Sequence, residues 1–170
     1  MMDSISAVFA LKTLFLSGLS LWFTLAIVNN LTDPGTNIYL IGQMMRMDLI
    51  KEDPNLGNGL QWRAVSGALA HKIVFYCVVL AQIVAVILLW RASIAFFGIA
   101  MHFTNAPTLA KSIYLGNLGL GAFAAIWISF WTGGMWFGYW MKMPQVQQVH
   151  MMLLVISMCG FLLVNLPVQI

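Results

Sequence analysis

Two histidines in this sequence have the chemistry and the placement to hold a cofactor. His71 and His150 each lie near the start of a long apolar run that follows a polar stretch. If the two runs form parallel helices, both imidazoles lie at a similar depth, and two inward-facing imidazoles can ligate a haem axially. The alternative is that each is an interfacial histidine hydrogen-bonded to a loop carbonyl or to water. His102 lies at the opposite end of its run and cannot join them.

Methionines offer a second possible ligand set. Thioethers are soft ligands suited to Cu(I), and five of them occur in polar segments expected on one side of the molecule: Met44, Met45, Met47, Met141 and Met143. Methionine is also a common filler of apolar packing surfaces, so packing is the alternative. We expect no cofactor, with haem b and copper as the two alternatives.

The acidic residues form no catalytic pattern. Asp33 precedes Pro34, and an aspartate N-cap with proline at the first helical position is a typical helix start. Glu52 and Asp53 fall in a solvated turn. Because the sequence has no Ser/His/Asp order, P-loop or glycine-rich phosphate loop, we expect that the protein is not an enzyme.

The composition places these residues in a membrane protein. The chain is 61% hydrophobic and 8% charged, whereas soluble domains are about 25% charged. A membrane-spanning helix needs about 20 apolar residues. We therefore predict an all-α, integral membrane four-helix bundle, a single domain over residues 1–170, with spans over about 7–28, 69–90, 109–131 and 146–166. The cations are scattered, so a nucleic-acid partner is not expected.

The polar segment between the first two spans is expected to help position the candidate ligands. Residues 29–68, here called the cap, separate the first two spans and contain most of the acidic residues. Disordered loops lack large apolar residues, but the cap has several, so we expect an ordered structure with a short amphipathic helix after Asp33. Arg63 could then bridge to Asp33 or Asp48.

Three expectations concern the spans themselves. Lys12 is expected to snorkel its ammonium to the headgroups. The second membrane helix is expected to begin near Leu60, and residues 92–110 are expected to form an interfacial hairpin. Small residues of the third span, including Gly121 and Ala125, are expected to pack within the bundle, with homodimerisation as the alternative.

Several motifs together resemble a bacterial family of predicted small integral membrane proteins whose function is not established. They are Asn29-Asn30-Leu31-Thr32-Asp33-Pro34-Gly35-Thr36-Asn37, Met47-Asp48, Trp62-Arg63-Ala64, His71, Tyr76, Gly133-Gly134-x-Trp136-Phe137, Gln147-Gln148 and Asn165-Leu166-Pro167. The resemblance implies four spans in the bacterial inner membrane, cytoplasmic termini and a periplasmic cap. It implies no activity. The family usually has Glu where this chain has Gln82 and Met135, which weakens a transport function.

These observations favour an accessory or stabilising subunit of a larger membrane complex. The middle of each span lacks ionisable residues, and small and aromatic packing residues are abundant. The expected partners are the lipid bilayer and other membrane-protein subunits. The cap residues expected to face a partner or to hold the cap together are Asn29, Asn30, Asp33, Asp48, Trp62 and Arg63. The alternative is a membrane redox protein that binds haem or copper.

Overall fold

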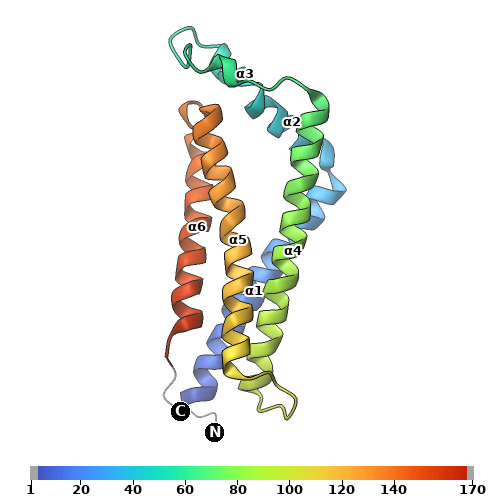
Figure 1. The fold of residues 1–170 in the computed structure, drawn as a ribbon, viewed down its shortest axis with the longest axis vertical. Coiled ribbons are helices and arrows are strands. Elements are labelled where there is room, and N and C mark those ends of the chain that lie inside the picture. Colours follow the sequence, from blue (N-terminus) through green and yellow to red (C-terminus); the bar gives the residue numbers. More distant parts are fainter. Residues whose placement is uncertain (1–3, 168–170) are drawn as a thin grey trace.

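The structure is a computed structural model that describes residues 4–167, and within that range it is helical without strands (Figure 1). The long helices are α1 (Ser4–Thr32), α4 (Ala68–Ala100), α5 (Leu109–Phe137) and α6 (Pro144–Asn165). The short ones are α2 (Pro34–Met45), α3 (Asp48–Lys51) and two 3₁₀ turns, η1 (Gln61–Arg63) and η2 (Tyr139–Met141). In this described range, four helices are long and apolar enough to cross a membrane, which confirms the predicted all-α four-helix architecture.

Local sequence explains where several helices begin and end. The Asp33 side chain accepts a hydrogen bond from the backbone N–H of Thr36, so Asp33 is the N-cap of α2 with Pro34 after it, as predicted. Thr108 caps α5 in the same way. At the other end of α5, Gly138 has a φ of 65°, a conformation that glycine adopts at low cost.

The second membrane helix differs from the expectation at both ends. It begins at Ala68 and continues past Arg91 to Ala100, so a start near Leu60 and a hairpin beginning at residue 92 are both wrong. Residues 92–100 contain no proline, and their buried members pack against the first span: Phe96 stacks on Phe9 with ring centroids 6.3 Å apart. The connection to α5 is therefore only residues 101–108.

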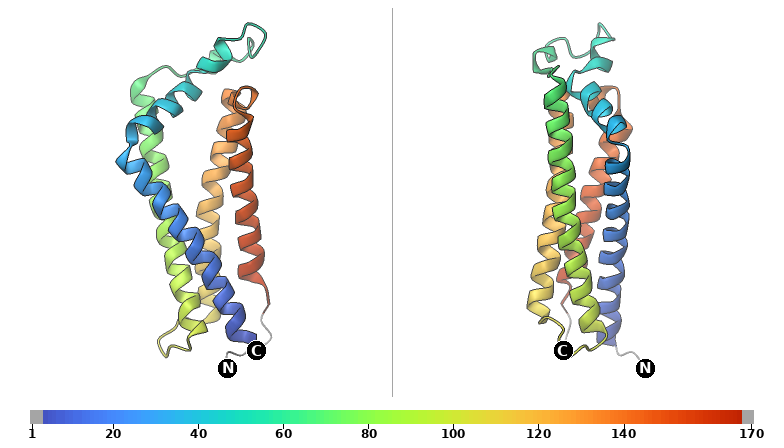
Figure 2. Two further views of the ribbon diagram at one scale, coloured as in Figure 1. Left: turned by 180° about the vertical axis from the view of Figure 1, so that it is seen from behind. Right: turned by 90° about the vertical axis from the view of Figure 1, so that its right-hand side faces the viewer.

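The four long helices form a chain of neighbours in which α1 packs on α4, α4 on α5, and α5 on α6. Figure 2 shows that α1 and α4 diverge from α5 and α6 as the helices approach the cap. The backbones of α4 and α5 come close at Gly119, where an added Cβ would lie 3.0 Å from the backbone nitrogen of Leu89. The start of α1 and the end of α6 lie together at the end opposite the cap (Figure 1).

Polar side chains join the helices inside this apolar bundle. Asn30 donates to Gln82 at 2.8 Å, and the Trp90 indole donates to Thr24 at 3.1 Å, so both contacts link α1 to α4. Lys12 is fully buried and donates to carbonyl oxygens at the end of α6. The expectation that Lys12 snorkels to the headgroups is wrong. Snorkelling requires the ammonium of Lys12 to extend to the surface, whereas here it is buried and bonded to the last carbonyls of α6, which otherwise lack helical partners.

Candidate functional site

The cap is a folded layer across one end of the bundle. Its helix α2 slants over the gap between the two helix pairs, and α3 lies above α5 and α6 (Figures 1 and 2). The two helices meet at Met47, which is buried and has a φ of 59°. A positive φ is uncommon for a residue other than glycine, so this sharp bend depends on the packing around it.

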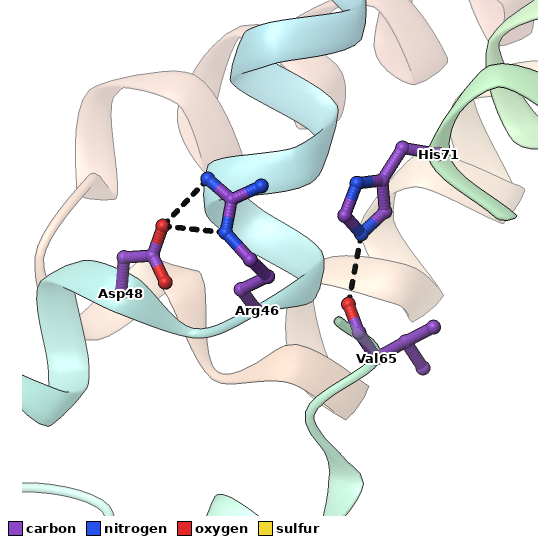
Figure 3. Close-up of polar contacts among 4 residues, drawn as sticks. All are labelled: Arg46, Asp48, Val65 and His71. Carbon is purple, nitrogen blue, oxygen red and sulfur yellow. Dashed lines mark hydrogen bonds and ion pairs between the residues drawn. The ribbon is translucent and has the colours of Figure 1, made fainter. Parts of the chain in front are cut away.

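Arg46 and Asp48 hold the two sides of that bend together. Arg46 Nη2 lies 2.7 Å from Asp48 Oδ2, and Arg46 Nε donates to the same oxygen (Figure 3). Asp48 is thus paired within the cap, and the Asp33 side chain caps the start of α2. The predicted bridge from Arg63 to either aspartate is therefore wrong.

Arg63 instead connects the cap to the end of α5. Its Nη1 donates to the carbonyl oxygen of Trp136 at 3.2 Å, and its guanidinium carbon lies 4.7 Å from the centre of the Trp136 ring. The Trp62 ring also lies near this group, 5.4 Å from the guanidinium carbon, and it meets the Trp136 ring edge-on with centroids 5.8 Å apart. A guanidinium over an indole face is attracted by the ring quadrupole, so backbone and aromatic contacts act together here.

A second connection reaches from the cap to the turn between α5 and α6. Lys142 Nζ lies 2.7 Å from Asp53 Oδ2, although the residues are far apart in the sequence. This hydrogen bond from Lys142, together with one from the backbone of Asn55, holds the pKa of Asp53 below its ordinary value. The cap is thereby attached at two points to the α5 and α6 side of the bundle.

His71 helps to attach α2 to α4. Its Nε2 lies 2.8 Å from the carbonyl oxygen of Val65 (Figure 3). Because a carbonyl oxygen only accepts, Nε2 has the proton. The backbone N–H of Val65 donates in turn to Met45 at 2.8 Å. Gly42 permits the close approach, since an added Cβ would lie 2.9 Å from His71 Nδ1.

His150 is held by different partners. Its Nδ1 lies 2.9 Å from the Tyr139 hydroxyl, and its ring stacks on Phe130 with centroids 4.9 Å apart. Burial raises the pKa of Tyr139 to about 12, so this hydroxyl stays protonated at neutral pH. His71 and His150 thus have separate hydrogen-bond partners, and haem ligation by the pair stays a prediction.

The structure brings together three of the five methionines. Met44, Met47 and Met143 line one small cavity of about 10 Å³ beside Tyr139. Met45 lines a different and larger cavity, and the Met141 methyl group lies near Gly138. Among the described residues, no group of three or more His, Cys, Asp or Glu side chains is placed to hold a metal ion. Copper binding by the methionines stays a prediction.

The larger cavity was not predicted from the sequence. It has a volume of about 600 Å³ and lies between α4 and α5, on the cap side of their contact at Gly119. Its walls are residues of α4 between Ile73 and Val84 and of α5 between Ala122 and Phe137, with α2 and Tyr139 at the cap end. Ala125, Ser129 and Gly133 repeat every four residues along one wall. This four-residue spacing of small side chains is the feature of the sequence that could have indicated the cavity.

Four glycines of α5 fall into two groups, those that contact a neighbouring helix and those that do not. Gly116 and Gly119 meet neighbouring helices, as expected for packing within the bundle. An added Cβ at Gly121 or Gly133 would meet nothing within 4 Å. These two glycines of α5 therefore face open space in the described part of the chain.

The chain was compared with known proteins. A family model described as "Predicted small integral membrane protein (DUF2165)" matches residues 8–167. The comparisons with curated proteins and with solved structures found no match.

Proposed function

The chain belongs to this family of predicted small integral membrane proteins, and from that premise we propose that it is an accessory subunit that stabilises a larger complex of the bacterial inner membrane. Its termini are cytoplasmic and its cap is periplasmic, as the family resemblance implies. It performs no catalysis of its own. The cap is the surface that contacts the partner subunit.

The observation that supports this proposal is that the cap is held firmly and yet presents apolar side chains outward. Lys142 holds Asp53, and Arg63 holds the end of α5. On the outside of the same layer, the Tyr39 side chain is 61% exposed and Trp62 is 73% exposed. Aromatic side chains are enriched in protein interfaces, and an ordered surface loses little conformational entropy when it binds.

Co-purification from native membranes tests the proposal. The tagged protein is extracted in a mild detergent, and its partners are identified and counted against those of Arg63→Ala. Removing the guanidinium deletes a charge-assisted hydrogen bond and two ring contacts, which costs the cap about 1–2 kcal/mol. We expect recovery of the partner to fall several-fold while the four spans still insert.

Lys51→Ala is the matched control, because Lys51 is an exposed cap cation with no ion pair among the described residues. Its recovery of the partner should equal that of the wild type. Rapid proteolysis of residues 36–58 in the intact complex would contradict the proposal, as would full retention of the partner after deletion of that segment.

A second candidate function is copper binding by the three methionines that share a cavity. A volume of about 10 Å³ is room for roughly one water-sized particle, and thioethers suit Cu(I). Metal analysis of the purified protein, and Cu(I) titration of wild type against Met143→Leu, tests this candidate. A visible spectrum of the same sample, with and without His71→Ala, tests haem.

A further inference from the structure

The large cavity between α4 and α5 is closed at both ends. Its lower end is the contact of Gly119 with the backbone of Leu88 and Leu89, where the two helices are too close to admit a chain. Its upper end is covered by Ile41, Met44 and Met45 of α2. The helices diverge between these ends (Figure 2), so the space can be reached only sideways, from the membrane.

The depth of the cavity matches one leaflet of a bilayer. Its α5 wall extends from Ala122 to Phe137, which at ~1.5 Å per residue is roughly 22 Å. A bilayer with its headgroups is about 40–45 Å thick, so half of it has the same depth. The cavity thus begins near the middle of the membrane and ends at the interface on the cap side.

The lining has no charged side chain and offers no free hydrogen-bond donor from its hydroxyl groups. The Ser129 hydroxyl donates to the Ala125 carbonyl at 2.8 Å, and the Tyr139 hydroxyl is engaged with Phe130 and His150. An occupant must therefore be uncharged over this length and must need no hydrogen bond. A hydrocarbon chain meets both conditions.

A transmembrane helix of a partner does not fit the same space. Such a helix needs about 20 residues to cross the hydrocarbon core and must continue into the headgroup layer. Here α2 covers the cap end of the groove, so a continuous helix would collide with it. A flexible chain that ends within one leaflet avoids that collision.

We propose that this cavity binds an acyl chain of a glycerophospholipid from the leaflet on the cap side. The methionines of α2 are flexible and can adapt to such a chain. Arg63 lies over Trp136, the neighbour of Phe137 at the upper end of the cavity wall. It supplies a cation near the depth where the phosphate of the lipid would lie, and arginine pairs readily with phosphate.

The test uses the full-length protein in nanodiscs of phosphatidylglycerol and phosphatidylethanolamine, transferred to detergent and weighed by native mass spectrometry. The variants are Gly133→Leu and Gly121→Leu, two glycines of α5 that both face open space. Gly133 lines the cavity and Gly121 does not. We expect one retained phospholipid per chain in the wild type and in Gly121→Leu, and at least a five-fold loss in Gly133→Leu.

A second measurement needs no substitution. Cys77 and Cys159 are both free and exposed, and of the two only Cys77 lines the cavity. In detergent, alkylation of Cys77 by N-ethylmaleimide should be several-fold slower with lipid bound than after delipidation, while Cys159 should react equally in both states. An unchanged Cys77 rate, or a wild-type protein that retains no lipid, would overturn the proposal. Retention of an isoprenoid lipid or of a second copy of the chain instead would also overturn it.

Discussion

Lys12 caps the last turn of the last membrane helix: its ammonium nitrogen lies 3.0 Å from the carbonyl oxygen of Val164 and 3.1 Å from that of Leu166. The Phe9 and Phe96 rings lie 5.8 and 5.6 Å from the same nitrogen. An ammonium near a helix C-terminus is stabilised by the helix dipole and by unpaired carbonyls. This contact joins α1 to α6 at the end of the bundle opposite the cap.

Replacing Lys12 should loosen that end. Lys12→Ala leaves the carbonyl oxygens of Val164 and Leu166 without this donor, and a hydrogen bond to a charged group contributes about 1.5–3 kcal/mol. We expect a loss of about 2 kcal/mol of stability and faster amide exchange over the last turn of α6. Lys111→Ala, at an exposed lysine, is the control. Equal thermal unfolding of the two variants would show that the contact contributes nothing.

Two neighbouring glycines of α5 should respond differently to the same substitution. An added Cβ at Gly134 would meet the Gln147 amide oxygen and the Tyr139 ring, whereas one at Gly133 would meet nothing within 4 Å. Forcing a methyl group into packed space costs typically 1–3 kcal/mol. We therefore expect Gly134→Ala to lower the unfolding temperature and Gly133→Ala to leave it unchanged. The reverse order would contradict the packing of η2 on α5.

The contact between Lys142 and Asp53 should depend on pH. The pKa of Asp53 is below its ordinary value of 3.8 in the folded protein. Its contribution is therefore fully present above pH 3.8 and is lost as the pH falls through the folded pKa. The Asn55 backbone N–H, which donates to Asp53 at 3.0 Å, reports this titration by NMR. In Lys142→Met the midpoint should move up toward 3.8, and an unmoved midpoint would exclude Lys142 as the main cause.

How much the sequence could predict depends on the range of the interactions involved. The four spans follow from long apolar runs, and the start of α2 follows from Asp33 and Pro34, because both signals are local. The partner of Arg63 is 73 residues away and that of Lys12 is 152 residues away. Hydrophobic periodicity says nothing about such pairs. Charge alone pairs Arg63 with the aspartates, whereas in the structure Arg63 donates to the backbone of Trp136.

The cavity could not be predicted either, because it depends on how the helices pack. Ala125, Ser129 and Gly133 are spaced as small residues that let helices approach, and the sequence cannot tell whether a neighbour fills that face. The answer depends on how α4 and α5 diverge from their close contact at Gly119. For the candidate ligands, the spans predict a similar depth for His71 and His150, which stays a prediction, whereas their Val65 and Tyr139 partners could not be predicted.

The orientation of the chain can be measured directly. We expect a cysteine at Asn58, in an exposed turn of the cap, to react with a membrane-impermeant maleimide added to intact spheroplasts. The periplasmic cap implied by the family resemblance predicts this result. Labelling that requires permeabilised membranes would place the cap in the cytoplasm.

The most direct test of the accessory-subunit proposal is site-specific photo-crosslinking in native membranes. A photoreactive amino acid is placed at Tyr39 on the outside of the cap, and at Leu80 as a control, a residue of α4 that is 63% exposed on the membrane-spanning surface. The proposal predicts that Tyr39 forms a specific adduct with one membrane protein and that Arg63→Ala weakens that adduct. Crosslinks from Tyr39 to lipid alone, with a pattern equal to that of Leu80, would contradict it.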